Sequence, residues 1–246
     1  MQTTRTLKSL GPIDLASVRR DPLLRWMMFM PIVMAVLIRL AVEALTKATL
    51  ERMNFDLTPY YPVIASYFLV LLVPFIFGVV IGFLLLDERD DQTLIALQVT
   101  PLPLTSYLVY RILAPSILSV IMVLITFRLS GLSSVSLGQE LLVALGSALL
   151  APMFAMFLAA FASNKVQGFA LMKGMGAVLL IPIASYFVTS NLEILFGVFP
   201  TYWPIKAYWM MEAGESGYLI YLAVGVTYML ALLVFFVRRF NKVLHQ

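Results

Sequence analysis

The chain has 246 residues, of which 61% are hydrophobic and only 12% are charged, and its mean hydropathy is +0.95. A soluble domain of this length cannot hide so much apolar surface, whereas a lipid bilayer can accommodate it. The sequence has no cysteine, which excludes disulfides and thiolate metal sites, and its one histidine stands next to last. We therefore expect no metal site. The net charge of +4 is better explained by membrane topology than by nucleic-acid binding.

The first 22 residues are polar and basic, so they do not resemble a cleavable signal peptide. We expect residues 1–22 to be cytoplasmic or interfacial. The stretch 13–20 predicts an interfacial helix, with its arginines at lipid headgroups and four apolar residues facing the acyl chains: Ile13, Leu15, Ala16 and Val18. The alternative is a basic tail that only fixes the orientation of the chain.

Six apolar runs are long enough to cross a bilayer as helices, because lipid cannot satisfy open backbone groups. They cover residues 23–45, 60–86, 106–127, 137–162, 171–190 and 218–237. No repeat or low-complexity linker separates them. The sequence therefore predicts an all-α membrane protein with six transmembrane helices, forming a single domain over residues 1–246.

Basic residues are distributed unevenly between the two sides of these runs. If both chain ends lie on one side, that side carries 11 of the 17 lysines and arginines and the other side carries four. The remaining two, Arg39 and Arg111, lie within spans or at their edges. This asymmetry predicts that both termini and the loop 87–105 are cytoplasmic.

The loop 87–105 opens with four acids and continues with a short apolar stripe. Asp90 or Asp91 can cap a short helix that runs to Val99 and stops before Pro101. Such a short helix needs a packing partner, and we predict that it docks a soluble protein. The alternative is an amphipathic linker on the inner leaflet, although its acids would then face an anionic membrane surface.

The residues of this loop resemble the first cytoplasmic segment of ABC-2-type transporter permeases, and among these the bacterial fluoroquinolone-export type. The matching positions are Glu88, Thr93, Leu97, Thr100, Pro101, Tyr107 and Arg111. Gln92 stands where the family often has glycine. The resemblance covers nearly the whole chain, but this block is its most diagnostic part.

The resemblance implies a half-transporter, in which two permease subunits, identical or different, assemble with two separate ABC ATPase subunits. It implies that the loop 87–105 is a coupling loop, which docks the ATPase. The docking residues would be Asp87, Glu88, Asp90, Asp91, Thr93, Leu94 and Leu97, together with Arg111 of the third span. The sequence contains no G-x-x-x-x-G-K-[ST] phosphate loop. We therefore expect no catalytic residue and no bound cofactor in this chain, with ATP and Mg bound by the partner.

Charged residues inside spans are functional candidates. Arg39 and Glu43 are one helical turn apart in the first span and form either an ion pair near the outer edge or part of a substrate pathway. Arg111 either anchors the third span at the interface or contacts the partner.

The segment 191–217 is rich in aromatic residues and is interrupted by prolines. Pro200 and Pro204 flank Tyr202 and Trp203, which predicts a broken, partly inserted outer element that gates substrate release. The alternative is an ordinary aromatic belt at the membrane surface.

These observations predict the permease subunit of an ABC exporter in the bacterial plasma membrane. It would move a hydrophobic or amphipathic compound, such as a drug, out of the cell with ATP hydrolysed by a separate subunit. The alternative classes are a self-sufficient secondary carrier and an intramembrane enzyme. An enzyme would need convergent reactive groups, and a proton-driven carrier would need an acid at mid-membrane, for which Glu43 is the candidate.

Overall fold

The computed structural model describes residues 2–91 and 104–244, and within these ranges its regular elements are all helices. The α-helices are α1 (Gln2–Arg20), α2 (Pro22–Met53), α3 (Tyr61–Ala65), α4 (Leu72–Asp90), α6 (Leu104–Ser130), α7 (Leu137–Ser147), α8 (Leu150–Phe161), α9 (Lys165–Val178), α10 (Tyr202–Glu212) and α11 (Tyr218–Leu244). The 3-10 helices are η1 (Thr58–Tyr60), η3 (Pro182–Phe187) and η4 (Asn191–Val198), and η2 (Ser66–Leu71) is a π-helix. Most of the predicted helix 90–99 lies outside the described residues.

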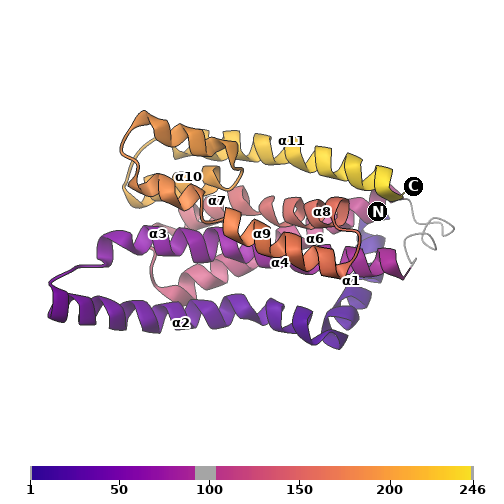
Figure 1. Cartoon of the computed structure of the whole chain (residues 1–246), viewed down its shortest axis with the longest axis horizontal. Coiled ribbons are helices and arrows are strands. Elements are labelled where there is room, and N and C mark those ends of the chain that lie inside the picture. Colours follow the sequence, from indigo (N-terminus) through magenta and orange to yellow (C-terminus); the bar gives the residue numbers. More distant parts are fainter. Residues whose placement is uncertain (1, 92–103, 245–246) are drawn as a thin grey trace.

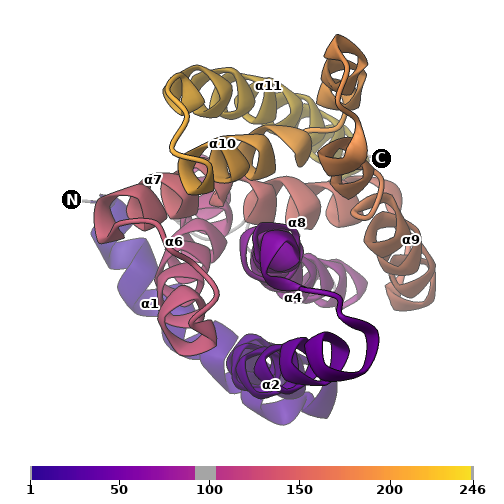
Figure 2. The same ribbon diagram turned by 90° about the vertical axis from the view of Figure 1, so that its left-hand side faces the viewer.

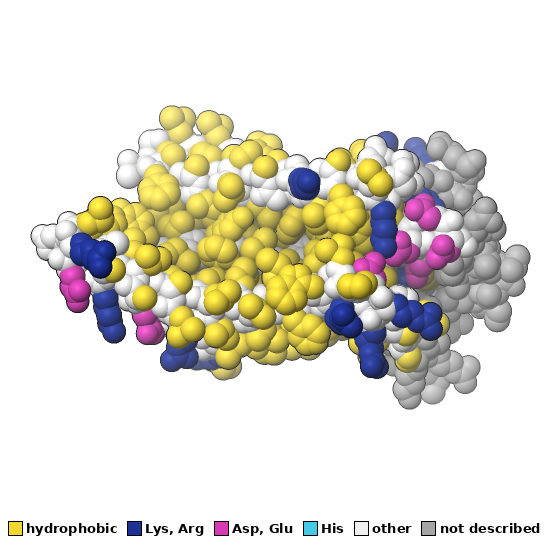
Figure 3. All heavy atoms as spheres, turned by 60° about the horizontal axis from the view of Figure 1, so that its bottom comes forward, with side chains coloured by type: hydrophobic (Ala, Val, Ile, Leu, Met, Phe, Trp, Pro, Cys, Tyr) yellow, Lys and Arg dark blue, Asp and Glu magenta, His cyan; other side chains and the backbone are white. Residues whose placement is uncertain are grey.

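Among the residues that the structure describes, six helical segments are long and apolar enough to span a bilayer. They are Pro22–Met53, Thr58–Asp90, Ser106–Ser130, Leu137–Phe161, Lys165–Phe187 and Tyr218–Lys242. They run along the long axis of the molecule, with both chain termini at one end, which we call the terminal end (Figure 1). A broad hydrophobic band separates the charged side chains at this end from those at the opposite, loop end (Figure 3). The predicted six-span all-α membrane fold is confirmed.

Helix α4 occupies the centre of the bundle. In the view along the bundle, α2, α6 and α8 surround it (Figure 2). Every residue from Val73 to Leu86 is buried, and none of these side chains is polar. A helix that is apolar on all sides is best accommodated where other helices cover every face.

Two glycines allow α8 to approach α4 closely. A Cβ atom at Gly78 would lie 2.5 Å from the carbonyl oxygen of Ala151, and one at Gly82 would lie 2.8 Å from a side-chain carbon of Leu158. The spacing Gly-x-x-x-Gly places both glycines on one face of α4, opposite the small residue Ala155. Small residues are the usual means by which membrane helices bring their backbones together.

Two spans are interrupted at prolines. In the fourth span, Pro152 cannot donate a hydrogen bond to Ala148, and the amide of Ala151 binds that carbonyl at 3.3 Å instead. In the fifth span, Pro182 cannot donate a hydrogen bond to the carbonyl of Val178, and the amide of Ile181 binds that carbonyl at 3.1 Å instead. Each proline thus exchanges one α-helical turn for a tighter turn.

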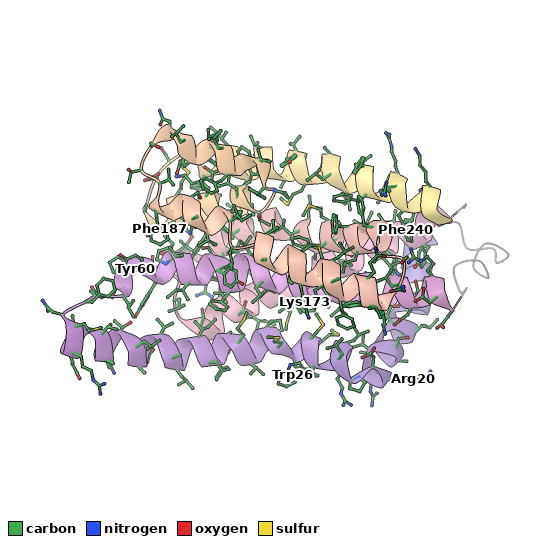
Figure 4. The ribbon with its side chains drawn as sticks, in the orientation of Figure 1. Arg20, Trp26, Tyr60, Lys173, Phe187 and Phe240 are labelled. Carbon is green, nitrogen blue, oxygen red and sulfur yellow. The ribbon has the colours of Figure 1, made fainter. Side chains whose placement is uncertain are left out.

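Helix α1 crosses the terminal end of the bundle instead of running along it (Figures 1 and 2). It is longer than the predicted stretch 13–20. Ile13 and Leu15 are each 57% exposed, but Val18, which we expected to face lipid, is buried against the bundle at 6% exposure. Arg20 points away from the bundle at the corner between α1 and α2 (Figure 4). The location of α1 at the membrane interface stays a prediction.

The segment 191–217 folds as a hairpin. Helix η4 runs from the loop end into the bundle, residues 199–201 form the turn, and α10 runs back to the loop end. The turn lines the same cavity as Met153 and Phe154, well inside the fourth span. Glu212, at the other end of α10, accepts a 2.9 Å hydrogen bond from the Ser133 hydroxyl at the loop end. The helical break lies at Pro200, whereas Pro204 sits in the first turn of α10, where its missing N–H is tolerated.

The close contact between α4 and α8 leads to a stability prediction. Gly78→Ala should lower the free energy of unfolding by about 1–3 kcal/mol, because the new methyl group would meet backbone that cannot move aside easily. The measurement is the thermal unfolding midpoint of the purified protein in detergent. Gly174→Ala in α9, where an added Cβ meets nothing within 4 Å, is the matched control. Equal midpoints for the two variants would contradict the proposed role of Gly78.

Candidate functional site

The last turn of α4 carries four consecutive charged residues, and the first three, Asp87, Glu88 and Arg89, directly follow the buried apolar stretch. Successive residues of a helix point in directions about 100° apart. These three side chains therefore reach three different neighbours. We call them, together with the side chains that they bind, the α4 end cluster.

Glu88 binds Arg111 of α6, whose side chain is 0% exposed. The guanidinium also lies 2.7 Å from a carboxylate oxygen of Asp14 in α1. Its Nε donates to the Tyr107 hydroxyl at 3.1 Å, and that hydroxyl in turn donates to Glu88. Tyr110 donates to Asp14 at 2.6 Å. The buried cation is thus held by two carboxylates and two tyrosines from three helices.

Asp87 forms a second ion pair, with Lys165 at the start of α9, at 2.9 Å. The same ammonium group lies 3.1 Å from Asp21, the residue between α1 and α2. The other oxygen of Asp21 accepts hydrogen bonds from the amides of Leu23 and Leu24 and so caps α2. Burial raises the pKa of Asp21, but the hydrogen bonds from Lys165 and the two amides outweigh it and hold this pKa below its ordinary value.

Arg89 reaches the end of α8. Its guanidinium donates to the carbonyl oxygen of Ala162 at 2.7 Å and, more weakly, to that of Ala159 at 3.4 Å. Carbonyl groups at a helix C-terminus lack partners within the helix and carry partial negative charge, so a cation is favourable there. One turn of α4 therefore binds α6, α8 and α9 at the terminal end, and Arg111 and Lys165 extend these contacts to Asp14 of α1 and to Asp21, the cap of α2.

The charged side chains of this cluster bind one another or the backbone of neighbouring helices. Within residues 2–91 and 104–244, no group of three or more His, Cys, Asp or Glu side chains could hold a metal ion. The carboxylates of the cluster are already bound to arginine, lysine or tyrosine.

The residues predicted to dock a partner fall into three groups. Asp90 and Asp91 are exposed beyond the cluster. Thr93, Leu94 and Leu97 lie outside the described residues. Asp87, Glu88 and Arg111 bind other parts of this chain. Arg111 is fully buried within this chain, and its role at the interface or in partner contact stays a prediction. Docking itself stays a prediction.

The predicted pathway residues do not come together. Arg39 and Glu43 are both exposed on α2, and the predicted ion pair between them is not formed. Tyr202 is completely buried, and its ring packs edge-to-face on Trp203 at 5.5 Å. Trp203 donates its indole N–H to the carbonyl of Gly197 at 3.0 Å, which ties the two arms of the hairpin together.

Other side chains fasten the hairpin to the bundle, and the sequence analysis missed them. Trp209 donates to the Ser66 hydroxyl at 2.9 Å, at the start of the π-helix. Glu212 also accepts hydrogen bonds from Ser134 and, at 2.7 Å, from the Tyr208 hydroxyl. Burial and the neighbouring Glu212 raise the pKa of Tyr208, so this hydroxyl remains a donor. No sequence pattern signals these contacts.

The buried ion pair predicts a large difference between two neighbouring acids. Glu88→Gln should destabilise the protein by about 3–5 kcal/mol, because Arg111 would lose one of its two compensating charges in a buried site. Asp90→Asn, two residues away and exposed, should change stability by less than about 0.5 kcal/mol. Chemical unfolding in detergent measures both variants. Similar losses for both would show that Glu88 is not part of a buried network.

Comparison with known proteins identifies the family. The family model described as Fluoroquinolones export permease protein Rv2686c-like matches residues 14–237. Two Mycobacterium tuberculosis proteins, described as fluoroquinolones export permease proteins Rv2686c (strain H37Rv) and MT2760 (strain CDC 1551), are each 34% identical over 240 residues, which cover 96% of this chain and 94% of theirs. No solved structure matches the chain. The chain therefore belongs to the Rv2686c-like family of fluoroquinolones export permeases, in agreement with its resemblance to ABC-2-type permeases.

Proposed function

We propose that this chain is the permease subunit of an ABC exporter in the bacterial plasma membrane. It moves an amphipathic or hydrophobic drug outward, and ATP is bound with Mg and hydrolysed by a separate ABC ATPase subunit. Family membership and the names of the two relatives support drug export. The positive-inside bias supports an orientation in which the terminal end is cytoplasmic.

The main support for coupling to a partner is the position of the α4 end cluster. The cluster directly precedes residues 92–103, where the sequence predicts the docking loop. A force applied there would reach Asp87, Glu88 and Arg89 first. These side chains bind α6, α8 and α9, and Arg111 of α6 binds Asp14 of α1, so the force would pass to much of the bundle at once. Packed helices with specific polar contacts favour movement between discrete arrangements over continuous deformation.

An apolar cavity of about 430 Å³ supports the hydrophobic character of the cargo. It lies between α8, α9 and α11, at the tip of the hairpin. Its walls include Phe154, Phe157, Leu171, Met175 and Phe236. Cavities of this size and lining are typical of sites for small apolar molecules.

The exposed face of α9 supports the proposal that a second permease subunit packs against this chain. The fifth span begins at Lys165 and not at residue 171, where the sequence predicted it. Lys173, which the count of basic residues placed on the cytoplasmic side, therefore lies about 12 Å along the helix from Lys165, midway along the span (Figure 4). It is exposed and forms no ion pair with any residue that the structure describes. A lysine in that position is unfavourable against lipid, and a neighbouring subunit would shield it.

Docking is tested by charge reversal outside the buried network. Asp90→Lys combined with Asp91→Lys should reduce copurification of the ATPase subunit several-fold, because both acids are exposed next to the predicted docking loop. ATP-dependent uptake of a fluoroquinolone by everted vesicles should fall in parallel.

The matched control is Glu51→Lys combined with Asp56→Lys, which reverses two exposed acids at the loop end. This control should leave both copurification and uptake unchanged. If the terminal-end variant binds ATPase and transports drug as well as the control does, the docking assignment is wrong.

A further inference from the structure

A second cavity, of about 560 Å³, lies at the loop end of the bundle. It is formed by α3, η3, η4 and α10, and it is lined largely by polar and charged side chains, in contrast to the cavity at the hairpin tip. We call it the polar cavity. The nearby rings of Tyr60 and Phe187 lie 6.3 Å apart and mark where η1, which directly precedes α3, meets η3 (Figure 4). Its volume lies within the range of roughly 300–1,000 Å³ typical of sites for small organic molecules.

The charges of the polar cavity are not balanced. Three carboxylates line it, those of Glu193, Glu212 and Glu215, together with one ammonium group, that of Lys206. Lys206 lies 2.8 Å from Glu193 and neutralises it. The oxygens of Glu212 accept hydrogen bonds from α10 and from the loop before α7. Glu215 is exposed and binds no other side chain that the structure describes. The surplus of negative charge favours a cationic ligand.

Two aromatic rings on one wall of the polar cavity are held in place before any ligand arrives. Tyr186 and Trp209 pack edge-to-face with centroids 5.0 Å apart. Tyr186 donates its hydroxyl to the Pro59 carbonyl at 2.9 Å, and Trp209 donates its N–H to Ser66. Because both polar groups are already bound, the rings offer fixed apolar and π surface to a flat ligand. Sites arranged in advance lose less entropy on binding.

We propose that the polar cavity binds an amphipathic organic cation with a flat aromatic body, through Glu215 for charge and Tyr186 and Trp209 for the ring. Its role as a release site at the outer end of the pathway rests on the proposed export function, but the binding chemistry does not. Lys206 sets the selectivity, since it reduces the attraction for cations and provides the one positive charge for an anion.

Binding is measured on the full chain in lipid nanodiscs, without an ATPase subunit, by fluorescence polarisation. The probes are tetramethylrhodamine methyl ester, a cation, and fluorescein, an anion with the same ring system; empty nanodiscs correct for binding to lipid. The cation should bind more tightly than fluorescein. Glu215→Gln should weaken cation binding roughly twofold to fivefold, the range expected for one partly exposed charge contact. Lys206→Gln should strengthen it by a similar factor.

Glu51→Gln is the matched control, because it removes an exposed acid from the same end of the molecule outside the polar cavity. It should leave binding unchanged. Equal cation affinity in the wild type, Glu215→Gln and Lys206→Gln would overturn the assignment, as would an equal loss in Glu51→Gln. A failure of ATPase docking would not affect this measurement, so the two proposals can fail separately.

Discussion

The burial of α4 is the constraint on which the rest of the structure depends. Its central residues carry no polar side chain, so the helix has no face to present to water, and the other spans surround it. Gly78 and Gly82 then let α8 lie against its backbone. Contact between membrane helices relies on such packing, because lipid provides little hydrophobic driving force. The central position of α4 also determines where its charged last turn emerges.

That last turn supplies one of the charges that compensate a buried arginine. An unpaired guanidinium inside a membrane protein is expensive, and Arg111 is fully enclosed. Two carboxylates and two tyrosine rings compensate it, and they come from α1, α4 and α6. Such a network is weak evidence for stability, because a well-packed apolar replacement can be as stable. Its directional contacts fix the relative positions of three helices, as the proposed connection between a docking loop and the bundle would require.

Much of the fold could be predicted from the sequence because lipid imposes a simple rule. Long apolar runs must be helices, and the basic residues show which ends lie together. Pro200 also indicated where the hairpin would break, whereas Pro204 lies within α10. Partners distant in the sequence could not be predicted: Asp14 lies 97 residues from Arg111, and neither position shows a pattern that selects the other. The same holds for Trp209 and Ser66, which are 143 residues apart.

The central claim is that the end of α4 transmits force from the docking loop to the bundle. It is tested most directly by the number of ATP molecules hydrolysed per drug molecule transported in proteoliposomes of the assembled complex. Arg89→Gln removes the contacts with α8 and leaves the buried Arg111 network in place. The account predicts that this complex still assembles and hydrolyses ATP but transports less drug for each ATP. An unchanged ratio in a correctly assembled complex would contradict it.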